Sequence, residues 1–281
     1  MNDKIPLVSI ICTTYNHENF IREALDGFVM QKANFPFEII VHDDASTDKT
    51  AEIAKEYEEK YPYLFVNIYQ NINQYSKLDV NIWTDITFPM ARGKYIAICE
   101  GDDYWTDELK LQKQVDILEM QPKCVLCFHE ADIHNLNTGK TKQKKIPFFK
   151  NLFNTSDLIV LPWFVPTASI VFRTKNLPVI YPEWYLKSTT GDMPLMLFLS
   201  KYGYLYGIRE KMSVYNIGVP NGFTSKMQKN PMKQVKEFLS LLENSNKDYF
   251  NSKYTLQVNF RKLRCFLGRL KYNLITKCFK I

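Results

Sequence analysis

Val8-Ser-Ile-Ile-Cys-Thr-Thr-Tyr-Asn16 begins as an apolar run and ends in polar side chains. The apolar half is rich in β-branched residues and predicts a buried strand, so the polar half forms the loop at its carboxyl end. Apolar residues at helical spacing follow over residues 20–31. This order of strand, loop and helix is typical of the repeating unit of an α/β fold.

The same order recurs further along the chain. Residues 37–41 predict a second strand and residues 49–61 a helix, with Asp48 or Thr47 as its N-cap. A third strand, a helix-like segment and a fourth strand are predicted over residues 65–69, 80–90 and 93–99. Such alternation predicts a parallel sheet covered on both faces, with ligands bound beyond the carboxyl ends of its strands.

The chain has 281 residues, 46% of them hydrophobic, which suits one large domain or two small ones. No apolar run approaches the roughly 20 residues that span a bilayer. Residues 5–12 lack the features of a signal peptide, so we expect a cytoplasmic protein. The six cysteines match no zinc pattern and are expected to be reduced and buried, with the Cys124–Cys127 pair in a packed strand rather than a redox centre.

The net charge of +6 is unevenly distributed. Residues 226–281 contain 13 Lys and Arg and 3 Asp and Glu, or +10, and residues 1–225 contain 23 and 27, or −4. Residues 1–225 are acidic, and the sequence has neither a helix-turn-helix nor an aromatic RNA-binding pattern. Both observations argue against a nucleic-acid partner. In the tail, apolar residues at steps of four and three over 256–274 predict an amphipathic basic helix. That helix would pack on the domain, pair with another chain or lie on an anionic membrane surface.

Polar loops follow three predicted strands, at residues 13–16, 43–44 and 100–103. Each loop alone is explained by turn and capping residues. Together they crowd carboxylates at one edge of the sheet, where Mg²⁺ or Mn²⁺ would relieve the repulsion between them. Because these ions commonly join carboxylates to a diphosphate, the edge predicts a nucleotide site.

Three segments resemble glycosyltransferase family 2: residues 8–16, Asp43-Asp-Ala-Ser-Thr-Asp48 and Glu100-Gly-Asp-Asp-Tyr-Trp105. The match covers roughly residues 5–225 in the right order and spacing. The resemblance implies the GT-A fold, a Rossmann-like α/β fold with a mixed, mainly parallel sheet flanked by helices. It also implies a glycosyltransferase domain over residues 1–225, with a nucleotide-sugar half (1–105) and an acceptor half (106–225). Residues 226–281 would form a basic helical extension.

The resemblance also implies roles for single residues. Thr13 and Tyr15 would line the base pocket, with Tyr15 stacked on the base and Asp44 hydrogen-bonded to it. Asp102 would bind the metal. Glu100 and Gly101 would lie at the nucleotide, where Glu100 replaces the first Asp of the family's Asp-x-Asp motif with a side chain one methylene longer.

In the acceptor half, Asp192 stands before an apolar helix at 195–202, where the family has its catalytic Asp, so the resemblance implies that Asp192 is the catalytic base. A helix N-cap is the alternative role for Asp192. Asp103 and Trp105 are predicted acceptor contacts, against the alternatives of a cap for a helix at 108–119 and of core packing. For Trp163 and Trp184 the sequence favours packing.

Residues 212–225 resemble the family's closing segment, but Asn216 and Gly218 stand where many relatives carry a basic residue and a His. Contacts to the diphosphate are therefore expected from Arg209, Lys211 or Lys226. None of the four histidines is assigned to a metal, and His17, like the others, is expected to be structural or solvated.

The three loops, Asp192 and the resemblance together predict a Mn²⁺- or Mg²⁺-dependent transferase that moves a hexose or N-acetylhexosamine from a UDP-sugar. That the transfer is inverting is implied by the resemblance alone. The acceptor would be a glycan or lipid-linked precursor of a cell-surface polysaccharide. A sugar nucleotidyltransferase is disfavoured, because residues 13–19 contain no glycine or cation for a phosphate loop. A catalytically inactive nucleotide-sugar-binding or assembly protein of the same fold is the other alternative.

Overall fold

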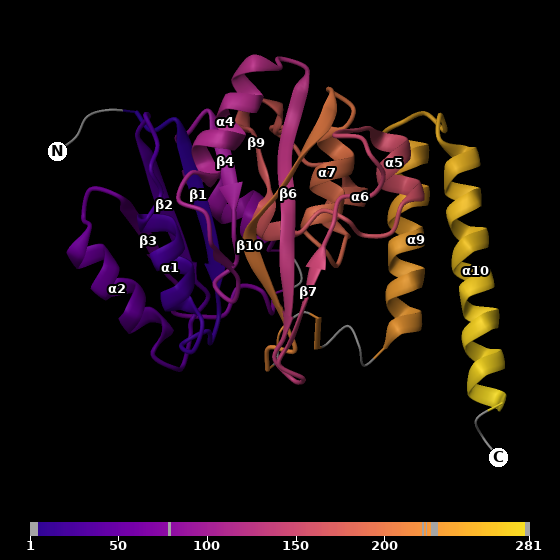
Figure 1. The fold of residues 1–281 in the computed structure, drawn as a ribbon, viewed down its shortest axis with the longest axis horizontal. Coiled ribbons are helices and arrows are strands. Elements are labelled where there is room, and N and C mark those ends of the chain that lie inside the picture. The colour runs from indigo at the N-terminus through magenta and orange to yellow at the C-terminus, as the bar shows by residue number, and fades with distance from the viewer. Residues whose placement is uncertain (1–4, 78–79, 221, 223, 226–229, 279–281) are drawn as a thin grey trace.

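The computed structural model describes residues 5–77, 80–220, 222, 224–225 and 230–278. One mixed sheet crosses the middle of the molecule, and the C-terminal helices stand on the side away from β1–β3 (Figure 1). Within the described residues the strand order is β3-β2-β1-β4-β9-β6-β10-β5, with β7 beside β6 and β8 beside β10. The strands are β1 (Val8–Thr14), β2 (Phe37–Asp43), β3 (Phe65–Tyr69), β4 (Tyr95–Ile98), β5 (Tyr104–Trp105), β6 (Cys124–Asn135), β7 (Lys140–Lys144), β8 (Leu152–Phe153), β9 (Val171–Arg173) and β10 (Tyr204–Ile217).

The predicted mainly parallel sheet is confirmed. Strand β1 is parallel to both β2 and β4, and β2 is parallel to β3. The run from Val8 to Cys12 is completely buried, as a strand covered on both faces requires. Strand β9 is antiparallel to β4 and to β6, which makes the sheet mixed.

The helices alternate with the strands in the first half of the chain and cluster in the second half. They are α1 (Ile21–Val29), α2 (Thr50–Lys60), α3 (Phe88–Met90), α4 (Lys110–Met120), α5 (Thr155–Val160), α6 (Glu183–Leu186), α7 (Asp192–Leu199), α9 (Pro231–Asp248) and α10 (Thr255–Cys278), with a π-helix η1 (Ile82–Thr87) and 3₁₀ turns η2 (Thr167–Ser169) and η3 (Thr174–Asn176). None of the described helices has both the length and the apolar composition needed to cross a bilayer.

Asp48 does not occupy the N-cap position of α2, which Lys49 holds. Instead, one Asp48 oxygen accepts from the backbone N–H of Thr50 (2.9 Å) and the other from that of Glu18 (3.1 Å). Asp48 therefore ties the loop after β1 to the start of α2.

Cys124 and Cys127 lie buried in β6 as free thiols. Burial raises the pKa of both thiols, so neither is activated for redox chemistry. The predicted packed strand is confirmed.

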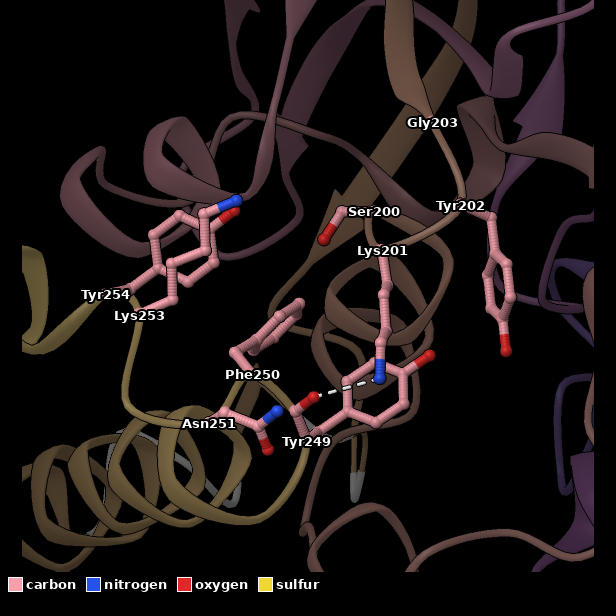
Figure 2. A pocket seen from close by; sticks show the side chains of 9 residues that line it. All are labelled: Ser200, Lys201, Tyr202, Gly203, Tyr249, Phe250, Asn251, Lys253 and Tyr254. Carbon is pink, nitrogen blue, oxygen red and sulfur yellow. Dashed lines mark hydrogen bonds between the residues drawn. The ribbon is translucent and has the colours of Figure 1, made fainter.

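The C-terminal helices dock on the rest of the protein near the end of α7. The rings of Phe198 and Tyr249 stack 5.0 Å apart, and Lys201 Nζ donates to the Tyr249 carbonyl oxygen (3.0 Å; Figure 2). Leu242 of α9 and Val258 of α10 join the same hydrophobic core as α7. A hollow of about 400 Å³ remains beside this junction.

Candidate active site

The three predicted loops meet at the carboxyl edge of β1, β2 and β4. The backbone N–H of Asp44 donates to the Thr14 carbonyl oxygen and that of Gly101 to the Thr13 carbonyl oxygen, both at 3.0 Å. A Cβ at position 101 would lie 2.7 Å from Thr14 Oγ1. Only glycine therefore lets the loop at 100–103 approach the loop after β1 this closely.

The residues expected around the base lie at the same edge. Tyr15 is 42% exposed, so its ring is accessible for stacking. Asp44 is buried, and its two oxygens accept from the backbone N–H groups of Gln74 (2.7 Å) and Tyr75 (2.9 Å). The segment after β3 thus holds Asp44 at this edge, a contact that the sequence did not predict.

Glu100, Asp102 and Asp103 form an acidic cluster, in which one oxygen from each residue lies within 4.8 Å of the others. Burial, and next the charge of Asp102, raises the pKa of both Glu100 and Asp103. Asp103 Oδ2 is buried without a hydrogen-bond partner among the described residues. Hard oxygen ligands, crowded negative charge and an unpartnered oxygen all suit a divalent cation.

Asn216 holds this cluster from β10. Its backbone N–H donates to Asp103 Oδ1 (2.8 Å), and its Nδ2 donates to the Asp102 carbonyl oxygen (2.7 Å). The alternative of a helix cap for Asp103 is wrong, because its carboxylate faces Asn216 and α4 begins only at Lys110. Asn216 is a positioning residue that the sequence analysis did not assign.

His17 also reaches the cluster, with its Nε2 3.9 Å from Asp102 Oδ2. The one indication of this contact in the sequence is that His17 directly follows the loop after β1. The structure therefore adds an imidazole to the acidic cluster.

Asp192 is the first residue of α7, and its charge contributes to the raised pKa of Glu100. Gly191, not Asp192, occupies the N-cap position, and a Cβ on Gly191 would lie 2.7 Å from the Trp83 ring. Burial raises the pKa of Asp192 itself, which makes the carboxylate a stronger base. The structure thus brings the predicted base to the same edge as the acidic cluster.

Trp163 orients Asp192, since its Nε1 donates to Asp192 Oδ2 at 3.3 Å. The Trp163 ring lies 5.4 Å from the Tyr215 ring, and Lys144 Nζ lies 4.6 Å from its centre. The sequence favoured packing for Trp163 and did not single out Tyr215 or Lys144. Burial raises the pKa of the Tyr215 phenol, and so do the charges of Asp103, Glu100, Asp192 and Asp102.

We expect Trp163→Phe to move the acidic limb of the pH profile of kcat/KM to higher pH. The indole N–H favours the ionised form of Asp192, so its removal raises the pKa of that carboxyl further. At neutral pH kcat should fall by roughly threefold to tenfold, the effect of one lost hydrogen bond.

Trp184→Phe is the matched control for this measurement. Trp184 is buried as the sequence favoured, and its Nε1 has no hydrogen-bond partner among the described residues. An equal shift of the pH profile in both variants would contradict the positioning role of Trp163.

Trp105 is not an acceptor contact. Its side chain is 2% exposed, its Nε1 donates to the Ala168 carbonyl oxygen (2.8 Å), and Lys110 Nζ lies 3.8 Å above its ring. The prediction for Trp105 is therefore wrong, because β5 turns this ring into the core.

The cations expected at the diphosphate have other partners. Arg209 donates to backbone carbonyl oxygens of residues 146–150, and Lys211 Nζ donates to Asp132 (2.8 Å). Lys226 lies outside the described residues. The hollow in Figure 2 is separate from the acidic cluster. It lies beside the first residues of β10, whereas Asn216, which bonds to the cluster, lies near the last residue of that strand.

The carboxylates of the acidic cluster lie at the same sheet edge as the carboxylate of Asp192 at the start of α7. This arrangement suits the binding and reaction of a nucleotide-linked substrate. The family model described as "Glycosyl transferase family 2" matches residues 9–176, so the chain belongs to this family. Uncharacterized protein Rv1520 of Mycobacterium tuberculosis (strain H37Rv) is 40% identical over 186 residues, which cover 64% of this chain and 52% of that protein. The chain thus spans about half the length of the first curated relatives it matches.

Two solved structures share the fold. S. aureus TarS 1–349 in complex with UDP-GlcNAc has a TM-score of 0.60 and 17% identity, covering 83% of this chain and 65% of that one. Mannosyltransferase PcManGT from Pyrobaculum calidifontis in complex with GDP-Man and Mn²⁺ has a TM-score of 0.61 and 17% identity, covering 88% and 66%. The predicted GT-A fold is confirmed.

Proposed function

We propose that the protein is a metal-dependent inverting glycosyltransferase that uses a nucleoside diphosphate sugar as donor. The observation that carries this proposal is that the partly buried carboxylate of Asp192 lies close enough to the acidic cluster for its charge to raise the pKa of Glu100. A binding protein needs no base there, whereas transfer to a hydroxyl group does.

A UDP-sugar is the proposed donor. The accessible ring of Tyr15 would stack on the base, and a spare lone pair of the Asp44 carboxylate would accept an N–H of uracil. The two solved neighbours are in complex with UDP-GlcNAc and with GDP-Man, so both nucleotides belong in any test.

Asp102, with Glu100 and Asp103, would hold Mn²⁺ or Mg²⁺. When bound, the cation supplies positive charge for the oxygens of the diphosphate. Asp192 accepts the proton of the acceptor hydroxyl as its oxygen bonds to the anomeric carbon. The bond from that carbon to the diphosphate breaks, and its electron pair leaves with the nucleotide.

The proposed acceptor is a glycan or a lipid-linked precursor in cell-surface polysaccharide synthesis. The partly buried Trp163 offers an aromatic face near Asp192, and the ammonium of Lys144 lies over that ring. These two side chains would contact the acceptor sugar.

The test is release of nucleoside diphosphate by the full chain in Mn²⁺, with UDP-, GDP- and dTDP-sugars tried in turn. An extract of glycans and polyprenyl-linked sugars serves as the acceptor. We expect release from one class of donor, increased by the extract. Release from none of them would overturn the proposal.

A further inference from the structure

Helix α10 (Thr255–Cys278) turns an apolar face away from the protein. At 100° per residue Leu256, Phe260, Leu263 and Leu267 fall within an arc of about 60°, and we call this arc the apolar stripe. Its four side chains are 82%, 48%, 53% and 53% exposed, in that order. Figure 1 shows α10 as the outermost helix at its side of the molecule.

The opposite side of α10 makes the contacts with the domain. Val258 is buried, Arg261 donates to the Val160 carbonyl oxygen (3.3 Å), and Lys262 pairs with Glu243 of α9. Because these contacts already hold the helix, the apolar stripe is not used for packing on the described residues of the chain. Helix α10 therefore does pack on the domain, as one of the three alternatives predicted, but through the side opposite to the apolar stripe.

The charge of α10 narrows the choice of partner. Residues 255–278 contain six Lys and Arg and no Asp or Glu. An exposed apolar face of this kind indicates an interaction surface, and the positive charge of the helix favours an anionic partner. A second copy of α10 would bring six more cations and no carboxylate to offset them.

We propose that α10 binds an anionic lipid surface. The apolar stripe would enter the boundary between headgroups and acyl chains, and basic side chains of α10 other than Arg261 and Lys262, which bond to the domain, would contact the headgroups. This inference goes beyond the proposed function, and it requires no sugar donor, so either can fail without the other. A lipid-linked acceptor would lie at the same surface as the enzyme.

The test is sedimentation of the full chain with vesicles. We expect binding to vesicles that contain phosphatidylglycerol, and binding weaker by at least about tenfold to pure phosphatidylcholine. Raising the salt concentration from about 0.1 M to 0.5 M should also weaken binding. The double variant Leu263→Glu, Leu267→Glu should lose at least about tenfold in affinity, because it places two carboxylates in the stripe.

The control is Tyr63→Glu, Met120→Glu, two side chains that are each 69% exposed and lie outside α10. Unchanged circular dichroism and unfolding midpoints would show that both double variants fold. Absence of binding to anionic vesicles, or equal binding by the stripe variant, would overturn the proposal. So would a dimer of the wild type, seen by light scattering without lipid, that the stripe variant does not form.

Discussion

Asp192→Asn is expected to lower turnover by about 10²- to 10⁴-fold and to leave nucleotide affinity within about twofold. The amide keeps the shape of the side chain. Trp163 Nε1 and the Met193 N–H donate to different oxygens of Asp192, so the single amide oxygen keeps one of these two hydrogen bonds. What it loses is the basic oxygen that takes the proton of the acceptor. Turnover is followed by release of nucleoside diphosphate, and affinity by calorimetric titration.

Asp157→Asn is the matched control, since Asp157 is also an aspartate in the first turn of a helix. Its carboxylate forms a capping box with Asn154 at the start of α5. We expect this variant to lose about 1 kcal/mol of stability and no turnover. Turnover near the wild-type rate in Asp192→Asn, or loss of nucleotide binding in it, would contradict a role for Asp192 as base.

Asp102→Asn is expected to weaken nucleotide binding only when metal is present. With Mn²⁺ present, the variant loses a charged ligand of the acidic cluster, and nucleotide affinity should fall by at least about tenfold. In EDTA, affinity should equal or exceed that of the wild type, because one negative charge beside the diphosphate is gone. Both affinities are measured by titration with UDP.

Asp116→Asn controls for the loss of one aspartate. Asp116 is exposed on α4, and its Oδ1 accepts from Gln112 (2.8 Å). This variant should bind UDP like the wild type in both conditions. Weaker binding by Asp102→Asn in EDTA as well as in Mn²⁺ would indicate a change of shape and would contradict the metal role.

The first half of the fold was predictable because its signals are local. The strand over residues 65–69 agrees with β3 at both ends. The helix predicted over residues 20–31 is the shorter α1, Ile21–Val29. Helix ends depend on capping contacts, such as those of Asp48 with Glu18 and Thr50, which join separate segments and are not visible in a spacing pattern.

In the candidate site, too, local patterns locate some of the residues, and others come together only through long-range contacts. The acidic loop at 100–103 and Asp192 stand next to a strand and a helix, so local patterns and the family resemblance located them. The bonds from Trp163 to Asp192 and from Asn216 to Asp103 span 29 and 113 residues, and only the folded chain forms them. The prediction of Trp105 as an acceptor contact failed because its position beside an acidic loop does not reveal the direction of the ring. In the structure the Trp105 ring packs against Phe28 in the core.

The central claim is a metal-dependent site for a nucleotide sugar. Its most direct test is the unfolding midpoint of the full chain in Mn²⁺, with UDP, GDP, CMP, dTDP and their sugars added in turn. A ligand at about 100 times its Kd stabilises the folded state by about 2.7 kcal/mol and raises the midpoint. We predict such a rise with a UDP-sugar and its disappearance in EDTA. No rise with any nucleotide, or an equal rise in EDTA, would contradict a metal-dependent nucleotide-sugar site at Glu100, Asp102 and Asp103.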